Sequence, residues 1–388
     1  MSSISSLDLF CGAGGLSLGL KAAGVKTVGA FDSDLDSVNT YNHNLESVAR
    51  QVDIFDLLES QELREFRGVE LLAGGPPCQG FCLINPKRRT DDPRNSCLDA
   101  FLYAVKVLQP KYCLIENVTG LISLGHGFAI KKLESFFSDI GYKYSYKVLQ
   151  AAHYGVPQSR WRFILLASRL GSELNFPLPS HAAIIRPNFA RGRELTFPVV
   201  EDLLSQLTQP TTVLDAIGDL PDLANGGHYI GKYIKTNALG DYATKLHNKN
   251  GDVLNHRTRK MSELQMQRIF ALKNPGDNWT NLPPELLPGN LKRLFDKYGT
   301  AMGSLTRFRR LEWNKQFSTI VTSPDPYWGA FIHPVQHRVI SVREAARAQG
   351  FPDDFEFTGS MTSSYRQIGN AVPPILASAI GTAAFKNG

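Results

Sequence analysis

The sequence predicts an α/β protein in which a doubly wound sheet is followed by a second, more irregular domain. Over the first 170 residues, short apolar runs alternate with amphipathic stretches, which is the pattern of successive strand–helix–strand units. After about Leu170 prolines and glycines become frequent and the periodicity weakens, and the α/β pattern returns at about Ser341. We therefore expect a large domain at 1–175, a smaller domain at 176–335 and a C-terminal segment at 336–388.

The strands expected in the first region are short and apolar, and several end at polar or glycine-rich turns. They lie at Ile4–Phe10, Thr27–Phe31, Val69–Ala73, Tyr112–Glu116, Lys143–Leu149 and Arg162–Ala167. Periodicity predicts helices at Leu16–Ala23, Leu98–Leu108, Ser341–Gln349 and Pro374–Ala384. We expect the last two strands to form an antiparallel pair. In such a sheet, ligands bind outside the carboxyl ends of the strands.

Composition excludes several classes of protein. With 388 residues, of which 43% are hydrophobic and 20% charged, the chain is in the ordinary globular range, so a mainly disordered chain or a fibre is excluded. No apolar run approaches the roughly 18 residues of a membrane span, and Met1–Ser6 lacks the charged start of a secretory signal. We therefore expect an intracellular protein with no membrane partner.

All cysteines lie in the first third of the chain, at Cys11, Cys78, Cys82, Cys97 and Cys113. A disulfide framework needs cysteines spread through a small secreted chain, and zinc binding needs a second pair to match Cys78 and Cys82. We therefore expect no metal site. The cysteines are either buried structural thiols or include one reactive thiol.

The net charge of +6 is concentrated in one window. Gly251–Lys315 holds 12 Lys/Arg against 6 Asp/Glu, so this window accounts for the whole excess. Such a patch fits a polyanionic partner, and a solvated basic face is the alternative.

A glycine-rich turn, Asp8–Gly15, follows the first strand, where a cofactor can approach the backbone at a helix N-terminus. The dinucleotide fingerprint G-x-G-x-x-G would need glycine at Ser17, so it is not met. Asp32, at the end of the second strand, can accept both hydroxyls of a ribose. Asp53 can accept from an adenine amino group. For each aspartate the alternative is a helix cap or a turn residue.

Three further groups follow expected strands. Cys78 comes after two prolines at the carboxyl edge of the sheet, which suits a nucleophile, and the basic stretch Lys87–Arg89 that follows suits phosphate. Glu116 ends a parallel strand at the same edge, and a thiol with a carboxyl group suits attack on an electron-poor ring. Alternation on a strand would put Arg160 and Arg162 on one face, where they could bind a base oxygen, a phosphate or Glu116.

Five motifs occur in one order and resemble those of the DNA (cytosine-5)-methyltransferase family: Asp8–Gly15, Gly75–Phe81, Glu116–Val118, Gln158–Arg162 and Arg366–Pro373. Ser341–Phe351 resembles the penultimate motif of that family. The resemblance covers nearly the whole chain except much of 176–320. It implies a Rossmann-like domain dependent on S-adenosyl-L-methionine, a target-recognition domain and a DNA cleft between them. The segment from about 336 would return to the large domain and complete the cofactor pocket.

The resemblance also assigns roles to residues. Cys78 would be the nucleophile, Glu116 the acid, and Arg160 and Arg162 would position the base and hold Glu116. The cofactor-binding residues would be Phe10, Gly12, Gly14, Gly15, Leu16, Asp32, Asp53, Ile54, Pro76, Asn370, Ala371 and Val372. The DNA-binding residues would be Gln79, Lys87, Arg88, Arg89, Gln158, Arg307, Arg309 and Arg310. Two positions depart from the family: Asp32 stands where many relatives have glutamate, and Cys82 where serine is common.

The activity implied is transfer of a methyl group from S-adenosyl-L-methionine to C5 of cytosine in a specific double-stranded DNA sequence. It would use a covalent adduct of Cys78 with C6 and a flipped base. The expected enzyme is a monomer of prokaryotic type in the cytoplasm at the nucleoid, with a nuclear enzyme as the alternative. A cognate restriction endonuclease could act separately.

The sequence disfavours three other functions. An RNA cytosine methyltransferase of the same family typically carries a Cys-Phe-Thr tripeptide and a smaller recognition region, and this chain has neither. A catalytically silent DNA-binding regulator is disfavoured because Cys78, Glu116 and both arginines are intact. The broken glycine fingerprint argues against an NAD-dependent thiol enzyme.

Overall fold

The chain divides into two units, each assembled from separate stretches of sequence. The computed structural model describes residues 3–77, 96–123, 127–197, 205–234, 240–298 and 305–385. The first unit takes the chain up to Gly155, Arg160–Gln209 and the chain from Ala371, and the second takes Val156–Ser159 and Pro210–Asn370. This division differs from the expected boundaries, because 176–209 belongs to the first unit and 336–370 to the second.

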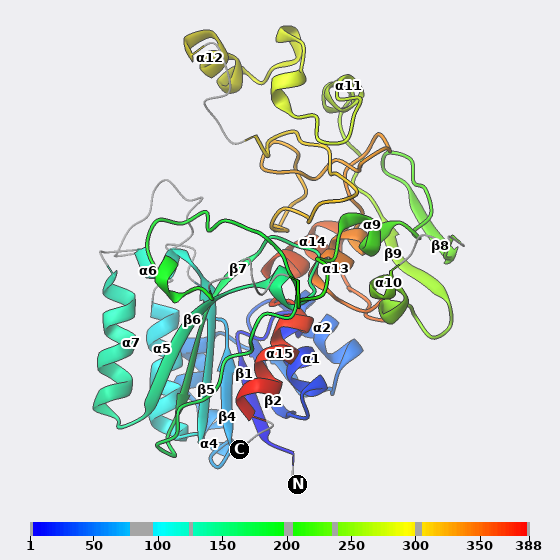
Figure 1. The fold of residues 1–388 in the computed structure, drawn as a ribbon. Helices are drawn as coiled ribbons and strands as arrows, with labels where there is room; N and C mark the ends of the chain where they lie inside the picture. Colours follow the sequence, from blue (N-terminus) through cyan, green and yellow to red (C-terminus); the bar gives the residue numbers. More distant parts are fainter. Residues whose placement is uncertain are drawn as a thin grey trace. The chain divides into compact units, whose positions relative to one another are not determined.

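The first unit is built on a mixed sheet whose described strands number seven, in the order β3-β2-β1-β4-β5-β7-β6 (Figure 1). The strands are β1 Ser5–Leu9, β2 Lys26–Asp32, β3 Ala49–Gln51, β4 Leu71–Gly74, β5 Tyr112–Val118, β6 Lys143–Gln150 and β7 Trp161–Ser168. The strands from β3 to β5 pair in parallel, whereas β7 pairs antiparallel with both β5 and β6. The expected antiparallel pair is therefore present, and the α/β class is confirmed.

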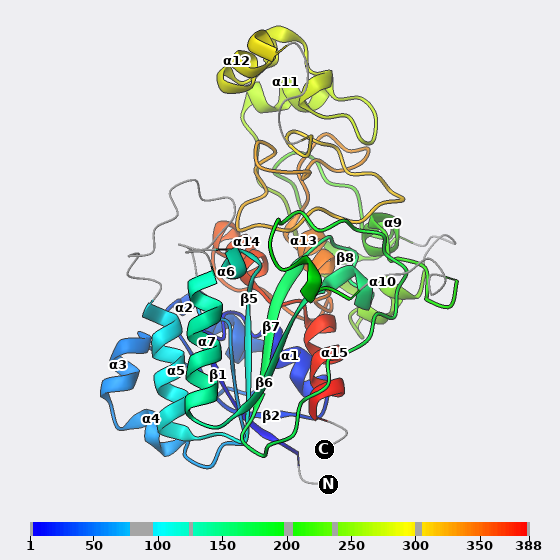
Figure 2. The ribbon, with the colours of Figure 1, turned by 60° about the vertical axis from the view of Figure 1, so that its left-hand side comes forward.

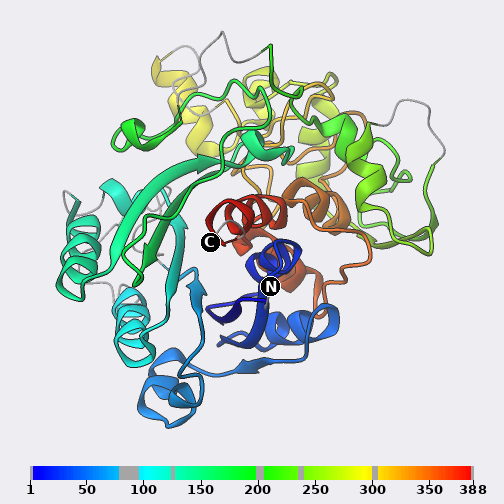
Figure 3. The ribbon, with the colours of Figure 1, turned by 60° about the horizontal axis from the view of Figure 1, so that its bottom comes forward.

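Helices cover both faces of this sheet (Figures 2 and 3). The main apolar core lies on the face covered by α3 Ile54–Glu59, α4 Glu62–Glu65, α5 Ser96–Leu108 and α7 Phe128–Asp139. The other face carries α1 Gly15–Ala22, α2 Leu35–Asn44 and α15 Pro374–Phe385, and α6 Gly120–Ser123 follows β5. Since side chains alternate along a strand, Leu7 and Leu9 of β1 enter the main core, and Asp8 points to the opposite face.

The C-terminal helix α15 packs closely on α1. A Cβ atom at Gly19 would lie 2.3 Å from the Pro374 carbonyl oxygen and 2.4 Å from Cβ of Ala377, so only glycine permits this approach. Met361–Phe385 is long and apolar enough to resemble a membrane span, with a mean hydropathy of 1.4. It consists of two helices, α14 Met361–Asn370 and α15, and α15 is part of the core of the first unit.

The second unit has less regular structure. Its strands β8 His228–Lys232 and β9 Asp252–Arg257 form an antiparallel pair. Its helices are α9 Val213–Ile217, α10 Asp241–Leu246, α11 Glu263–Ala271, α12 Gly289–Tyr298, α13 Val342–Gln349 and α14. Single 3₁₀ turns lie at Ala151–Tyr154, Arg193–Leu195, Trp279–Asn281 and Pro284–Leu286 across both units.

Buried ion pairs explain why the second unit extends to Asn370. Helix α13 begins after Ser341, whose hydroxyl accepts from the Glu344 N–H, and every residue of the helix is buried. From this helix Arg347 donates to Asp219 at 2.5 Å and to Asp353 at 2.6 Å. Through Arg347 these pairs connect α13 and Asp353 to Asp219, which is more than a hundred positions earlier, and composition along the chain does not show this connection.

Candidate active site

The glycine turn after β1 adopts a backbone that ordinary residues avoid. Gly12 and Gly14 have φ of 53° and 92°, and Phe10 has φ of 60° although it is not glycine. A Cβ atom at Gly14 would lie 2.6 Å from the Leu45 side chain and 2.8 Å from that of Tyr41, whereas one at Gly12 would meet no atom within 4 Å. Gly14 is therefore packed against neighbouring side chains, whereas there is free space beside Gly12. Helix α1 begins at Gly15, and Leu16 is buried.

Two carboxylates stand at the ends of the neighbouring strands. Asp32, at the end of β2, accepts from the Gly12 N–H at 2.8 Å and from the Asp34 N–H at 2.9 Å. Burial raises the pKa of Asp32, and these two hydrogen bonds oppose the shift. Asp53, after β3, is exposed and caps α3 by accepting from the Phe55 N–H at 2.9 Å, while Ile54 is buried. Asp53 is thus a helix cap, and Asp32 is a turn residue whose hydrogen bond to Gly12 holds the glycine turn in place.

Asp8, a buried acid that was not predicted as a site residue, connects strand β1 to helix α1 on either side of the turn. Asp8 is 1% exposed and accepts from the Ser17 hydroxyl at 2.6 Å, while its other oxygen has no hydrogen-bond partner. Burial raises the pKa of Asp8 to about 7. The signal in the sequence was a charged residue inside an otherwise apolar strand.

Glu116 and Arg162 form the centre of the site. The Arg162 Nε lies 2.7 Å from Glu116 Oε1, and both side chains are about nine-tenths buried, at 10% and 11% exposure. They come from β5 and β7, which pair antiparallel with Val118 opposite Arg162. The turn after β4 lies against the same carboxylate, because a Cβ atom at Gly75 would be 3.1 Å from Glu116 Oε2. The Asn117 amide also donates to the Pro76 carbonyl oxygen at 3.1 Å.

Arg160 lies beside Arg162 at this centre. It directly precedes strand β7, which begins at Trp161, and its carbonyl oxygen accepts from the Ala151 N–H at 2.9 Å. Its buried guanidinium donates to the Ala371 carbonyl oxygen at 3.0 Å. Burial lowers its pKa, Arg162 lowers it further, and Glu116 opposes the shift. The structure thus brings Glu116, Arg160 and Arg162 into one electrostatic group.

The C-terminal candidates lie where two helices meet. Asn370 ends α14 and is exposed, Ala371 is half-buried and Val372 is buried. Five candidates, together with the departure at Cys82, lie outside the described residues: Cys78, Gln79, Lys87, Arg88 and Arg89.

Two expected DNA contacts are corrected by the structure. Gln158 is fully buried, donates to the Ala348 carbonyl oxygen at 3.0 Å and accepts from the Ile320 N–H at 2.8 Å. Arg310 is also fully buried and donates to four backbone carbonyl oxygens, those of Ile269, Leu272, His333 and Gln336. Both side chains satisfy backbone groups at helix ends and in irregular segments: Ala348 and Ile269 lie near the ends of α13 and α11, and the other partners lie outside helices and strands. Neither is an exposed group for DNA.

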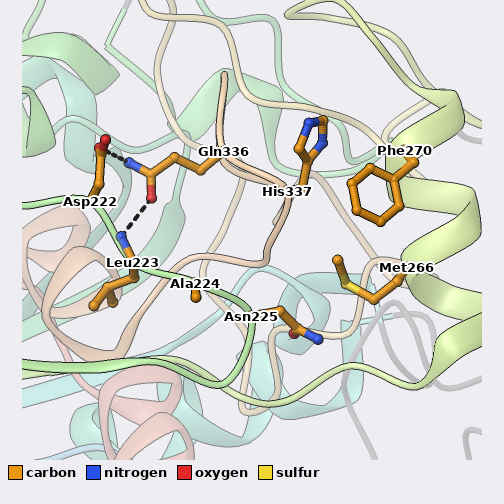
Figure 4. Close-up of a pocket in the computed structure, with 8 residues that line it drawn as sticks. All are labelled: Asp222, Leu223, Ala224, Asn225, Met266, Phe270, Gln336 and His337. Atoms are coloured by element: carbon orange, nitrogen blue, oxygen red, sulfur yellow. Dashed lines mark hydrogen bonds between the residues drawn. The ribbon is translucent and has the colours of Figure 1, made fainter.

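One pocket of about 420 Å³ lies in the second unit (Figure 4). Gln336 crosses one side of it, donating to Asp222 at 2.6 Å and accepting from the Leu223 N–H at 3.0 Å. His337 and Phe270 form another side, with ring centroids 4.6 Å apart. Arg310 donates to His337 and so supports this wall, and none of the catalytic candidates lines the pocket.

The comparison with known families decides the identity of the fold and the enzyme. The model of the C-5 cytosine-specific DNA methylases matches residues 4–386. The chain belongs to this family. It is 33% identical to the type II methyltransferase M1.HphI of Haemophilus parahaemolyticus over 99% of this chain and 87% of that protein. It is 30% identical to the type II methyltransferase M.AgeI of Thalassovita gelatinovora over 97% and 98% of the two chains.

Solved structures agree with this assignment. A prophage-encoded protein of E. coli described as a DNA modification methyltransferase superposes with a TM-score of 0.69 at 26% identity, over 98% of each chain. Dnmt2 of S. pombe superposes with a TM-score of 0.53 at 17% identity over 99% of each chain, which shows the fold alone. This cytosine-5 DNA methyltransferase therefore has the Rossmann-like methyltransferase fold and acts on cytosine in DNA, so the predicted family, fold and enzyme class are confirmed.

Proposed function

We propose that this enzyme methylates C5 of cytosine within a specific double-stranded DNA sequence, through a covalent adduct of Cys78 and a flipped base. The observation that supports the proposal most is the ion pair of Glu116 and Arg162, which lies next to Gly75, three residues before Cys78 in the sequence. The neighbouring Asn117 also donates to the Pro76 carbonyl oxygen. A carboxyl group held close to the chain segment that leads to Cys78 suits a reaction in which a thiolate attacks the cytosine ring and an acid protonates it.

The chemistry needs both groups because C5 of cytosine is a poor nucleophile in an intact aromatic ring. The Cys78 thiolate forms a bond to C6, and Glu116 gives a proton to N3, so the ring becomes an enamine whose C5 is electron-rich. After C5 has gained the methyl group it loses its proton, the bond between sulfur and C6 breaks, and aromaticity returns. The thiolate is regenerated and the proton on N3 is released.

The arginines position the acid and leave it available. The contact of Arg162 with Glu116 at 2.7 Å is to Oε1, and Oε2 lies next to the backbone of Gly75. Arg160 is fixed to the Ala371 carbonyl oxygen and adds positive charge next to the pair. In this arrangement one carboxyl oxygen is held while the other can transfer a proton.

The residues present fit S-adenosyl-L-methionine, which when bound supplies its methyl group as an electrophile. The open left-handed backbone at Gly12 leaves room for the ligand, and Asp32 lies directly beside it. Phe10, held in an unusual backbone conformation, would stack on the adenine. The other residues proposed to hold the cofactor are Gly14, Gly15, Leu16, Asp53, Ile54, Pro76, Asn370, Ala371 and Val372.

The target atom is unreachable in a stacked duplex, so the base must leave the stack at a cost of a few kcal/mol. Gln79, Lys87, Arg88, Arg89, Arg307 and Arg309 are the proposed DNA contacts. The type II relatives support a restriction–modification setting in the bacterial cytoplasm, with a separate endonuclease of the same specificity. We propose that the enzyme acts as a monomer.

The test is base-resolution 5-methylcytosine sequencing of unmethylated plasmid DNA incubated with the protein and S-adenosyl-L-methionine. We expect methylation at one short motif, abolished in Cys78→Ala and kept in the matched thiol variant Cys82→Ser. A folded, cofactor-binding protein that leaves DNA unmodified would overturn the proposal and direct the assay to RNA.

A further inference from the structure

Three arginines in the basic window Gly251–Lys315 have three different environments. Arg310 is buried on backbone carbonyl oxygens, and Arg309 is paired with Glu312 at 2.5 Å. Arg307 is half-buried and donates to the Tyr327 hydroxyl at 3.2 Å. Among the described residues, no carboxylate lies within ion-pair distance of Arg307. Its positive charge is therefore the one of the three that remains open to a partner.

Two aromatic rings hold the Arg307 guanidinium. Its central carbon lies 4.9 Å from the centroid of the Tyr327 ring and 5.9 Å from that of Trp328. The two rings stand edge to face, 4.8 Å apart, and Trp328 is 58% exposed. Stacking on aromatic faces restricts the rotamers of arginine, so less conformational entropy is lost when the guanidinium binds a ligand.

The backbone around this cluster is also fixed. The Phe308 N–H donates to the Pro326 carbonyl oxygen at 2.6 Å, which connects the segment of Arg307 to the segment of the two rings. The Trp328 N–H donates to Asp325 in the same turn, and the Trp279 N–H donates to the Arg307 carbonyl oxygen at 3.2 Å. A large exposed aromatic ring beside an unpaired cation is thus presented on a constrained scaffold.

We propose that Arg307 specifies a guanine in the recognition sequence of this enzyme, with Tyr327 as its positioning residue. A guanidinium fork matches O6 and N7 of guanine in the major groove, and this pair is the commonest specific contact between proteins and DNA bases. Binding of guanine by Arg309 would break its ion pair with Glu312, whereas Arg307 has no such pair among the described residues. The inference rests on the proposed function, because it names the base that the same enzyme reads.

The experiment is methylation of a plasmid library with randomised sequence around the target cytosine, followed by base-resolution sequencing. In Arg307→Ala and Arg307→Lys we expect the preference for guanine at one position to fall roughly 10- to 100-fold. Lysine keeps the charge that a phosphate needs and loses the fork that guanine needs, so both variants should relax the same position. Tyr327→Phe keeps the ring and should relax that position less.

The control is Lys249→Ala, which removes an exposed cation of the same unit and should leave the consensus unchanged. Thermal melting and cofactor binding establish that each variant is folded. An unchanged consensus in Arg307→Lys, or methylation reduced equally at all sites in Arg307→Ala, would show a phosphate contact and overturn the inference. A wild-type protein that methylates no DNA would instead overturn the proposed function.

Discussion

Two glutamate–arginine pairs, one in each unit, differ in how completely the carboxylate is satisfied. In the first unit Glu116 meets Arg162 through one oxygen at 2.7 Å, with the side chains 11% and 10% exposed. In the second unit Glu344 accepts from both terminal nitrogens of Arg338, each at 2.7 Å, and from the Ser341 N–H at 2.6 Å. The side chains of this second pair are fully buried.

The difference agrees with the role in proton transfer proposed for Glu116 and with a structural role for Glu344. Burial alone would raise the pKa of Glu344, but the charge and hydrogen bonds of Arg338 hold it well below its ordinary value, so this carboxylate stays ionised. A group that must give up a proton during turnover cannot be saturated in this way. The open oxygen of Glu116 is therefore as informative as its ion pair.

Replacing Glu116 tests the reactive half of the comparison and should have the largest effect. In Glu116→Gln the proton donor is lost while the shape and a contact with Arg162 remain, so we expect kcat to fall by roughly 10²- to 10⁴-fold. The midpoint of urea unfolding should stay near that of the wild type. Single-turnover methylation of DNA with saturating cofactor measures the rate, and a loss of less than tenfold would contradict a role in proton transfer.

Breaking the structural pair should instead lower stability. Arg338→Met leaves Glu344 buried without its cation, so we expect the free energy of unfolding to fall by about 3–5 kcal/mol. The double variant Arg338→Met/Glu344→Leu removes the unpaired charge and should recover much of that loss. Urea unfolding of both variants measures the effect. A single variant as stable as the wild type would show that the buried pair is not what holds this part of the unit.

The sequence predicted the pair of Glu116 and Arg162 better than that of Glu344 and Arg338. The apolar run before Glu116 predicts a buried strand there, and arginines at 160 and 162 are visible as candidates for its partner. No local pattern shows that Arg347 joins Asp219 to Asp353, or that Gln158 and Arg310 are buried on backbone groups. Most of these partners are distant in sequence and meet only through tertiary packing, which periodicity does not encode. Within the predicted basic window, Arg307, Arg309 and Arg310 thus differ: Arg310 is buried, Arg309 is paired with Glu312, and Arg307 has no carboxylate partner among the described residues.

An effect that depends on pH is expected from another buried acid, Asp8, which has a serine as its partner in place of an arginine. Its pKa is raised from 3.8 to about 7, chiefly by burial, with Ser17 lowering it and Asp32 raising it. Between these two pH values the unfolded chain has lost the proton that the folded protein keeps, so stability falls as pH rises, by at most about 1.4 kcal/mol per pH unit. Asp8→Asn keeps the shape and cannot ionise. The stability difference between wild type and variant, measured by urea unfolding, should therefore decrease from about pH 4 to pH 7 and then level off, and a constant difference across that range would show that Asp8 is ionised in the folded protein.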